Sequence, residues 1–257
     1  MRGWLVPYKS ESDPRLGVQV RHILSGNDGD VCNACVTEEI LKGYFEAYCI
    51  DIGVDEGWWS FFAANCNPLC KIDAFEPNSK SYKALLPYLK TTNQITLHNS
   101  AVSDTPGQIP FTAADGESHS RSKSDTFVPA VTLDKFVAWK LVHLIKIDTE
   151  GHDLKILRSL HPYIDSIMNI IFECTVYWYG TTKEECVQNT LNELLFLKSK
   201  YEYMYLLSRR GEPLLKMLRT PEDIMKFVHF SYDFKYQVDI LVTHAQIKSV
   251  PVQNLNV

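Results

Sequence analysis

The sequence predicts an α/β fold with a doubly wound, mostly parallel seven-stranded sheet and an antiparallel C-terminal strand pair. Three observations predict it. Short apolar runs alternate with segments of helical periodicity, which is typical of strands joined by crossover helices. A glycine turn directly follows the first apolar run, at residues 49–52. The last two strand candidates, 203–207 and 239–243, follow the alternating part and are expected to pair antiparallel.

The first half of the chain contains four predicted strands and three predicted helices. Thr37 is a predicted N-cap, because apolar residues follow it at helical spacing. Asn78 caps a later helix in the same way. We expect strands at 49–52, at 72–75, at 95–97 together with 100–102, and at 109–111, and helices from Thr37, at 58–64 and at 79–89.

The second half continues the alternation and adds two longer helices. Strands are expected at 144–148 and 169–173, with a helix over 151–160 between them. Thr182 and Glu185 form a capping box that opens a helix to about residue 198. Pro221 occupies the first position of another helix.

Length and charge limit the possible classes of protein. At 257 residues, a single domain over 37–257 is expected, preceded by an extension over 1–36. The net charge of −5 and the lack of a basic stripe argue against a nucleic-acid partner. No apolar run is long enough for a membrane span, and no signal-peptide pattern occurs at the N-terminus. We therefore expect a cytoplasmic protein.

The seven cysteines lie mostly in apolar segments. That placement suits buried thiols in a reducing compartment better than a disulfide framework. Cys32 with Cys35 and Cys66 with Cys70 could in principle hold zinc, but the spacing of the second pair is wide and no histidine-rich segment lies nearby. Two unrelated local pairs are the simpler interpretation.

The turn after the first strand has the spacing Asp51-x-Gly53-x-x-x-Gly57. Glycines there let backbone N–H groups approach a ligand closely. The pattern is not the dinucleotide motif G-x-G-x-x-G, and it fits better the looser turn of enzymes that bind S-adenosylmethionine. Glu76, which ends the second strand, is placed to accept hydrogen bonds from the two ribose hydroxyls.

Four acidic residues end or nearly end predicted strands: Asp51, Glu76, Asp148 and Glu173. A parallel sheet delivers the carboxyl ends of its strands to one edge, which is where ligands bind in open α/β folds. Buried carboxylates are costly unless paired. Their repeated occurrence at equivalent positions therefore predicts a functional site.

Five motifs resemble the FkbM-type methyltransferases. They are Cys49-Ile50-Asp51-Ile52-Gly53 with Gly57, Phe75-Glu76-Pro77-Asn78, Asn99-Ser100-Ala101-Val102-Ser103-Asp104 with Gly107, Val131-Thr132-Leu133-Asp134, and Leu144-Ile145-Lys146-Ile147-Asp148-Thr149-Glu150-Gly151-His152-Asp153. The resemblance covers about residues 48–173 in the family's order, and the last motif is the most distinctive. The sequence departs from the family at Val54-Asp55-Glu56, where the turn is more acidic.

The resemblance implies a Rossmann-like methyltransferase fold and a role for each matching residue. Asp51, Gly53 and Gly57 would form the cofactor turn, Glu76 with Asn78 would bind the ribose, and Asn99 and Ser100 would lie near the adenine of S-adenosylmethionine. Asp148, Glu150, His152 and Glu173 would form the catalytic set facing the methyl acceptor. Family members often methylate sugar hydroxyls, so we expect an O-methyltransferase acting on a small-molecule or glycan acceptor.

Several points stay open from the sequence. The general base is His152 or Asp148, or else Asp148 and Glu173 bind a divalent cation that acidifies the acceptor hydroxyl. The acceptor could instead be a non-sugar metabolite or a protein, and the chain could be an inactive binding or scaffold domain that keeps the fold. Aromatic residues at 177–179 suit a sugar ring but equally suit core packing. The oligomeric state is not determined by the sequence.

Overall fold

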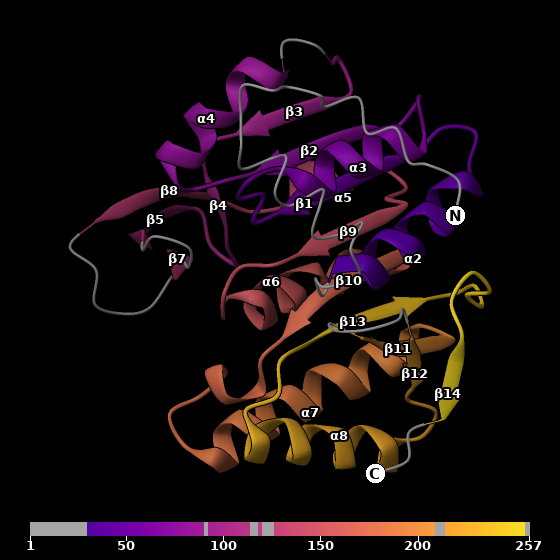
Figure 1. Cartoon of the computed structure of the whole chain (residues 1–257). Helices are drawn as coiled ribbons and strands as arrows, with labels where there is room; N and C mark the ends of the chain where they lie inside the picture. The colour runs from indigo at the N-terminus through magenta and orange to yellow at the C-terminus, as the bar shows by residue number, and fades with distance from the viewer. Residues whose placement is uncertain (1–29, 90–91, 114–117, 120–125, 209–213, 255–257) are drawn as a thin grey trace.

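A nine-stranded sheet forms the centre of the protein (Figure 1). The structure, a computed structural model, describes residues 30–89, 92–113, 118–119, 126–208 and 214–254. The strand order is β14-β12-β11-β13-β10-β9-β1-β2-β3. These strands are β1 (Tyr48–Ile52), β2 (Lys71–Phe75), β3 (Ile95–His98), β9 (Leu144–Ile147), β10 (Asn169–Cys174), β11 (Tyr203–Leu207), β12 (Leu215–Met217), β13 (Val238–Thr243) and β14 (Val252–Asn254).

The expected doubly wound sheet is confirmed, but the expected count of seven strands is wrong. Strands β3, β2, β1, β9 and β10 pair in parallel, and β13 pairs antiparallel with both β10 and β11. The antiparallel C-terminal pair is therefore present. Two further strands extend this edge: β12 pairs antiparallel with β11, and β14 pairs in parallel with β12. Both are only three residues long, too short to show a periodic pattern.

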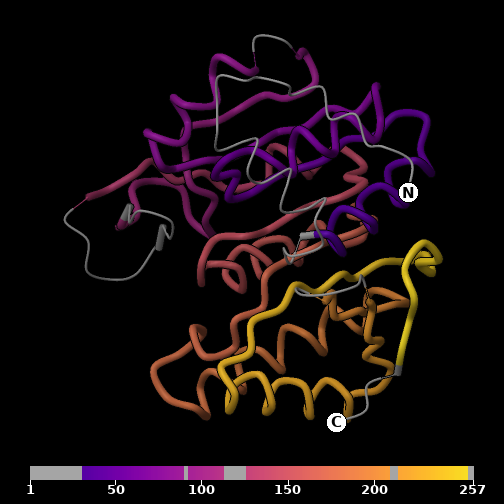
Figure 2. Tube along the Cα trace, in the orientation of Figure 1, coloured from indigo at the N-terminus to yellow at the C-terminus, as the bar shows by residue number. Residues whose placement is uncertain are grey.

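Helices cover both faces of the sheet. One core cluster joins strand residues such as Cys49 and Leu144 to α2 (Asp30–Lys42), α3 (Trp58–Cys66) and α4 (Ser79–Leu89). The other joins Ile50 and Ile145 to α5 (Asp134–Val137), α6 (Asp153–Leu160), α7 (Lys183–Lys200) and α8 (Pro221–Phe234). Figures 1 and 2 show α7 and α8 side by side. Because neighbouring residues of each central strand face opposite helix layers, those strands are apolar on both faces.

The helix expected from Thr37 starts earlier than the sequence suggested. Helix α2 extends back to Asp30, and Thr37 lies inside it rather than capping it. The Thr37 hydroxyl instead accepts a hydrogen bond of 3.0 Å from Trp59 Nε1. Cys32 and Val36 are buried in the core. The boundary expected at residue 36 thus falls within a core helix, and residues 1–29 of the expected extension lie outside the described residues.

The strand expected over 95–102 is two strands in two different sheets. β3 ends at His98, while β4 (Ala101–Val102) belongs to a small sheet with β5 (Gly107–Pro110) and β8 (Phe127–Val131). The remaining pair is β6 (Thr112–Ala113) with β7 (Ser118–His119), and two 3₁₀ helices, η1 (His161–Ser166) and η2 (Val176–Trp178), flank β10. The chain leaves the main sheet at Asn99, whose side chain bonds to the loop after β2.

Candidate active site

The turn after β1 requires glycine at two positions, because a side chain at either one would collide with neighbouring atoms. Gly53 has φ of 86°, and a Cβ on it would lie 1.7 Å from the carbonyl oxygen of Asp148. Gly57 has φ of 81°, and a Cβ there would lie 2.8 Å from Leu85 Cδ2 of α4. L-residues with side chains rarely adopt such positive φ values. The glycine at position 53 therefore lets the end of β1 pack directly on the loop after β9.

Asp51 lies beneath this turn with one hydrogen-bonded oxygen. Its Oδ2 accepts a 2.6 Å hydrogen bond from the Ser60 hydroxyl of α3. Its Oδ1 is buried without a hydrogen-bond partner among the described residues. Burial raises the pKa of Asp51 to about 6, and the Lys146 ammonium opposes that rise. A buried carboxylate oxygen of this kind is an acceptor for a donor that none of the described residues supplies.

Glu76 connects the turn after β1 to the loop after β2. One carboxylate oxygen accepts the Asp55 backbone N–H at 2.8 Å, and the other accepts the Asn78 backbone N–H at 2.7 Å. The side chain is 4% exposed, and burial raises the pKa of Glu76 to about 7. Each oxygen receives one backbone donor, so each keeps a second acceptor site.

Asn78 and Asn99, two of the expected cofactor-binding residues, lie around the loop that carries Glu76. Asn78 Oδ1 accepts the Lys80 backbone N–H at 3.0 Å, which confirms it as the cap of α4. Asn99 Nδ2 donates to the Glu76 carbonyl at 2.8 Å, and its Oδ1 accepts from the Ser79 hydroxyl at 3.0 Å. Ser100 is buried. The two asparagine side chains thus fix the shape of the loop that carries Glu76.

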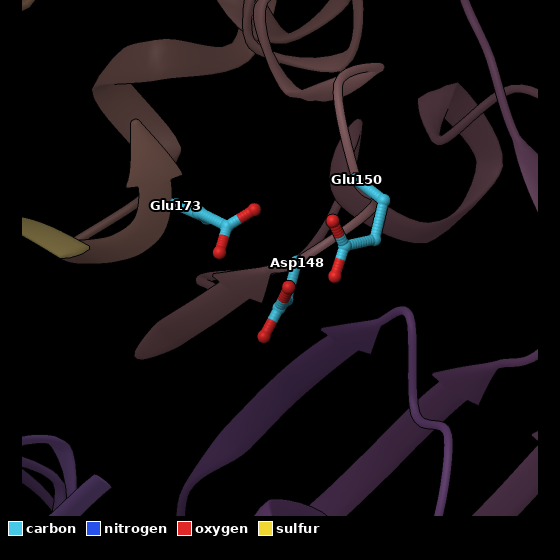
Figure 3. Close-up of side chains that lie close together, drawn as sticks. All are labelled: Asp148, Glu150 and Glu173. Atoms are coloured by element: carbon cyan, nitrogen blue, oxygen red, sulfur yellow. The ribbon is translucent and has the colours of Figure 1, made fainter. Parts of the chain in front are cut away.

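An acidic cluster is formed by Asp148 and Glu150, which follow β9, and by Glu173, the second-last residue of β10. Their side chains point toward one another (Figure 3). One carboxylate oxygen from each lies within 4.8 Å of the others. Glu173 is buried, whereas the other two are partly exposed. Lys146 Nζ donates to Asp148 Oδ2 at 3.0 Å. The structure therefore brings together three of the four residues expected to face the acceptor.

Two residues that the sequence reasoning did not assign shape this cluster. The carboxylate of Asp153 accepts hydrogen bonds of 3.0 Å from the backbone N–H groups of Thr149 and Gly151. It thereby holds the loop in which Glu150 has a φ of 53°. Gln237, directly before β13, donates from Nε2 to Glu173 Oε1. Asp153 is the last residue of the most distinctive motif, so its position in that motif could have indicated a role at the site. Nothing in the sequence indicated Gln237.

His152, the fourth expected catalytic residue, lies outside the acidic cluster. Its Nε2 is 3.1 Å from the hydroxyl of Ser103, which follows β4. The ring is mostly buried, and burial lowers the pKa of His152 to about 4. A histidine with such a pKa is neutral at pH 7 and is a weak base.

The parallel strands and the helices on both faces of the sheet define a Rossmann-like α/β fold. Residues 47–210 match the family model described as the methyltransferase FkbM domain. The match covers more than half of the chain, so the chain belongs to the FkbM methyltransferase family, which confirms the resemblance seen in the sequence.

Similar solved structures support the fold alone, because their sequence identity is low. A protein from Corynebacterium glutamicum has a TM-score of 0.50 at 10% identity, with 94% of this chain and 95% of that chain covered. A candidate O-methyltransferase from Klebsiella pneumoniae has a TM-score of 0.50 at 11% identity, with 94% of each chain covered. No match was found among curated proteins.

Proposed function

We propose that this methyltransferase uses S-adenosylmethionine to methylate a hydroxyl group, with a sugar or glycan as acceptor. The observation that carries the proposal is the acidic cluster of Asp148, Glu150 and Glu173, which lies directly beyond the glycine turn. Carboxylates at such a position can orient an acceptor hydroxyl and take up its proton.

The residues on the β1 and β2 side fit the cofactor. Glu76 keeps one acceptor site on each carboxylate oxygen, which suits the two hydroxyls of a ribose. Asp51 offers a buried oxygen that accepts no hydrogen bond from the part of the chain that the structure describes, which suits a cationic group such as the cofactor's ammonium. The bound cofactor supplies a methyl group on a positively charged sulfur.

The acidic cluster, rather than His152, is our proposed proton acceptor. Asp148 is held in one orientation by Lys146, and Glu150 lies beside it on a loop fixed by Asp153. The ring of His152 is directed to Ser103, and its lowered pKa makes it a poor acceptor. We assign His152 to supporting the loop after β9, where it sits just before α6.

A divalent cation at the acidic cluster is an alternative way to activate the hydroxyl. Mg²⁺ and Ca²⁺ prefer carboxylate oxygens, and the cluster offers three within 4.8 Å. The test is exhaustive chelation. This alternative predicts loss of activity that added Mg²⁺ or Mn²⁺ restores, and undiminished activity after chelation would contradict it.

A methyl-transfer assay tests the proposed function. The enzyme is incubated with S-adenosylmethionine and a panel of mono- and oligosaccharides, and products are examined by mass spectrometry for a gain of one methyl group. Methylation of only a non-sugar metabolite or a protein would replace the sugar assignment. Calorimetry with the cofactor distinguishes an active methyltransferase from an inactive scaffold domain, because the scaffold would show no measurable cofactor binding.

Two expectations from composition stay predictions. A cytoplasmic location and the absence of a nucleic-acid partner follow from the sequence alone. Within the described residues, none of the helices has the length and apolar character needed to span a bilayer.

A further inference from the structure

Large apolar side chains lie on the surface at one end of the central sheet. Strands β9, β1 and β2 are parallel neighbours in that order, so the segments that precede them lie side by side at the amino ends of these strands (Figure 1). Phe45 precedes β1, Leu69 precedes β2, and both Trp139 and Leu141 precede β9. We refer to these four side chains as the apolar patch.

The segments that carry the apolar patch are bonded to one another. The Asn67 side chain, before β2, donates to the Tyr44 carbonyl at 2.9 Å. His143 Nδ1, before β9, accepts the Tyr48 backbone N–H at 3.0 Å, and the His143 backbone N–H donates to the Tyr48 carbonyl at 2.8 Å. The His143 ring also meets the Tyr44 ring edge-on, with centroids 4.4 Å apart. The apolar patch therefore belongs to one connected surface.

The aromatic members of the apolar patch are almost fully exposed. Trp139 is 95% exposed and Phe45 is 83% exposed, the two largest values among the large hydrophobic side chains that the structure describes. Leu69 and Leu141 are exposed as well. Single exposed apolar residues are common, but several gathered on one surface are typical of a place where a partner or a membrane binds.

The charges beside the apolar patch are mostly positive. The segments that carry it are 42–47, 67–71 and 138–143. They contain one carboxylate, that of Glu46, and three exposed lysines: Lys42, Lys71 and Lys140. Two acidic residues on adjoining segments are in ion pairs, namely Glu38 with Lys42 and Asp165 with Lys200. This end of the molecule is therefore basic, although the whole chain has a net charge of −5.

We propose that the apolar patch docks the protein on an anionic lipid surface. Tryptophan and phenylalanine rings favour the boundary between acyl chains and headgroups, and lysine ammonium groups are attracted to anionic lipids. A second copy of this chain fits the surface less well, because a symmetric pair would bring the lysines of both copies together. The acidic cluster lies at the opposite, carboxyl ends of the strands, so docking leaves the proposed active site open to its acceptor.

Vesicle flotation tests the proposal on the whole protein. The probes are vesicles of phosphatidylcholine alone and vesicles of phosphatidylcholine and phosphatidylserine in equal parts, over a range of lipid concentrations at low and high salt. The variants are Trp139→Ser and the double variant Lys71→Gln with Lys140→Gln. The matched control is Phe234→Ser, which removes a ring that is 72% exposed at the end of α8, near the carboxyl end of β10. Circular dichroism checks that each variant is folded.

The proposal predicts that the wild type floats with the mixed vesicles and binds phosphatidylcholine alone more weakly. Trp139→Ser should bind the mixed vesicles about tenfold more weakly, because burial of a large apolar side chain contributes at least that factor. The double lysine variant should also bind them about tenfold more weakly, and high salt should weaken the wild type in the same direction. Phe234→Ser should bind like the wild type.

Two results would overturn the proposal. One is a wild type that floats with neither kind of vesicle, and the other is equal vesicle binding by Trp139→Ser and the wild type. Light scattering tests the competing occupant. A wild-type dimer that becomes a monomer in Trp139→Ser, with no flotation of the wild type, would assign the apolar patch to a second copy of the chain instead.

Discussion

Gly53 packs directly on the main chain of Asp148, with room for no side chain between them. The contact joins the turn proposed to bind the cofactor to the loop proposed to bind the acceptor. Glu76 joins the same turn to the loop after β2 through the Asp55 backbone N–H. The three loops at this edge of the sheet therefore hold one another in place.

Replacing Gly53 by alanine should disrupt this contact. The added Cβ would lie 1.7 Å from the Asp148 carbonyl oxygen, and positive φ alone costs alanine about 1–2 kcal/mol. We expect chemical denaturation to show a free energy of unfolding lowered by more than about 2 kcal/mol, and cofactor affinity to fall with it. The control is Gly107→Ala, which also has positive φ but meets no atom within 4 Å. Equal effects of the two substitutions would show that the contact is unimportant.

Substituting Glu76 by glutamine should weaken cofactor binding. Glutamine keeps the size of the side chain but removes its charge and one of its acceptor oxygens. Charge-assisted hydrogen bonds contribute about 1.5–3 kcal/mol, so affinity for S-adenosylhomocysteine should fall about 10- to 100-fold by calorimetry. Asp73→Asn is the matched control, because Asp73 lies on β2, the strand that Glu76 follows, but bonds to Tyr48 and His98. If both variants bind like wild type, Glu76 does not bind the ribose.

Cofactor affinity should rise with pH through neutrality. Burial raises the pKa of Glu76 to about 7, and the ionised carboxylate is the form that accepts both ribose hydroxyls. Affinity should therefore increase about tenfold between about pH 6 and 8. The increase should be absent in Glu76→Gln. A pH-independent affinity in the wild type would argue against ionisation of Glu76 on binding.

The stability of the ligand-free protein should show the opposite trend in the same range. The pKa of Glu76 is higher in the folded chain than in the unfolded chain. Between about pH 4.5 and 7 the folded state therefore binds more protons than the unfolded state does. Stability from Glu76 is therefore lost across that window. His152 opposes this below about pH 6.5, since its pKa is lowered to about 4. Urea denaturation of wild type and Glu76→Gln between about pH 4.5 and 8 isolates the Glu76 contribution, and parallel curves would contradict it.

The acidic cluster should control turnover more than His152 does. Asp148→Asn and Glu173→Gln should each lower kcat by about 100-fold or more, with cofactor affinity nearly unchanged, because proton transfer typically contributes a factor of that size. His152→Ala should lower kcat less than either. The measurement is steady-state kinetics with an acceptor found in the panel. A larger loss in His152→Ala would restore the histidine as the base.

Much of the fold was predictable because glycines and caps mark its boundaries. Thr182 is confirmed as an N-cap, since its hydroxyl accepts the Glu185 backbone N–H. The helix expected to begin at Pro221 is also confirmed, and Thr220 before it forms a capping box with Asp223. Strands β1, β2 and β11 agree with their predicted positions within one residue. These elements carry strong local signals, namely buried apolar runs and fixed turn residues.

The elements that escaped prediction depend on tertiary contacts. Strands β12 and β14 form at the edge of the sheet, where β12 pairs with β11 and β14 pairs with β12. The start of α2 was not predicted, because residues 25–30 are polar or glycine and show no helical periodicity. His152 was placed by motif position alone, and its neighbour Ser103 comes from a distant segment. Long-range side-chain partners of this kind leave no trace in local periodicity.

The most direct test of the account is a crystal structure of the protein soaked with S-adenosylhomocysteine. The account predicts that the ribose hydroxyls donate to Glu76, that the amino group lies near Asp51, and that the sulfur faces Asp148, Glu150 and Glu173. Density for the compound at any other place, or no density at a saturating concentration, would contradict it.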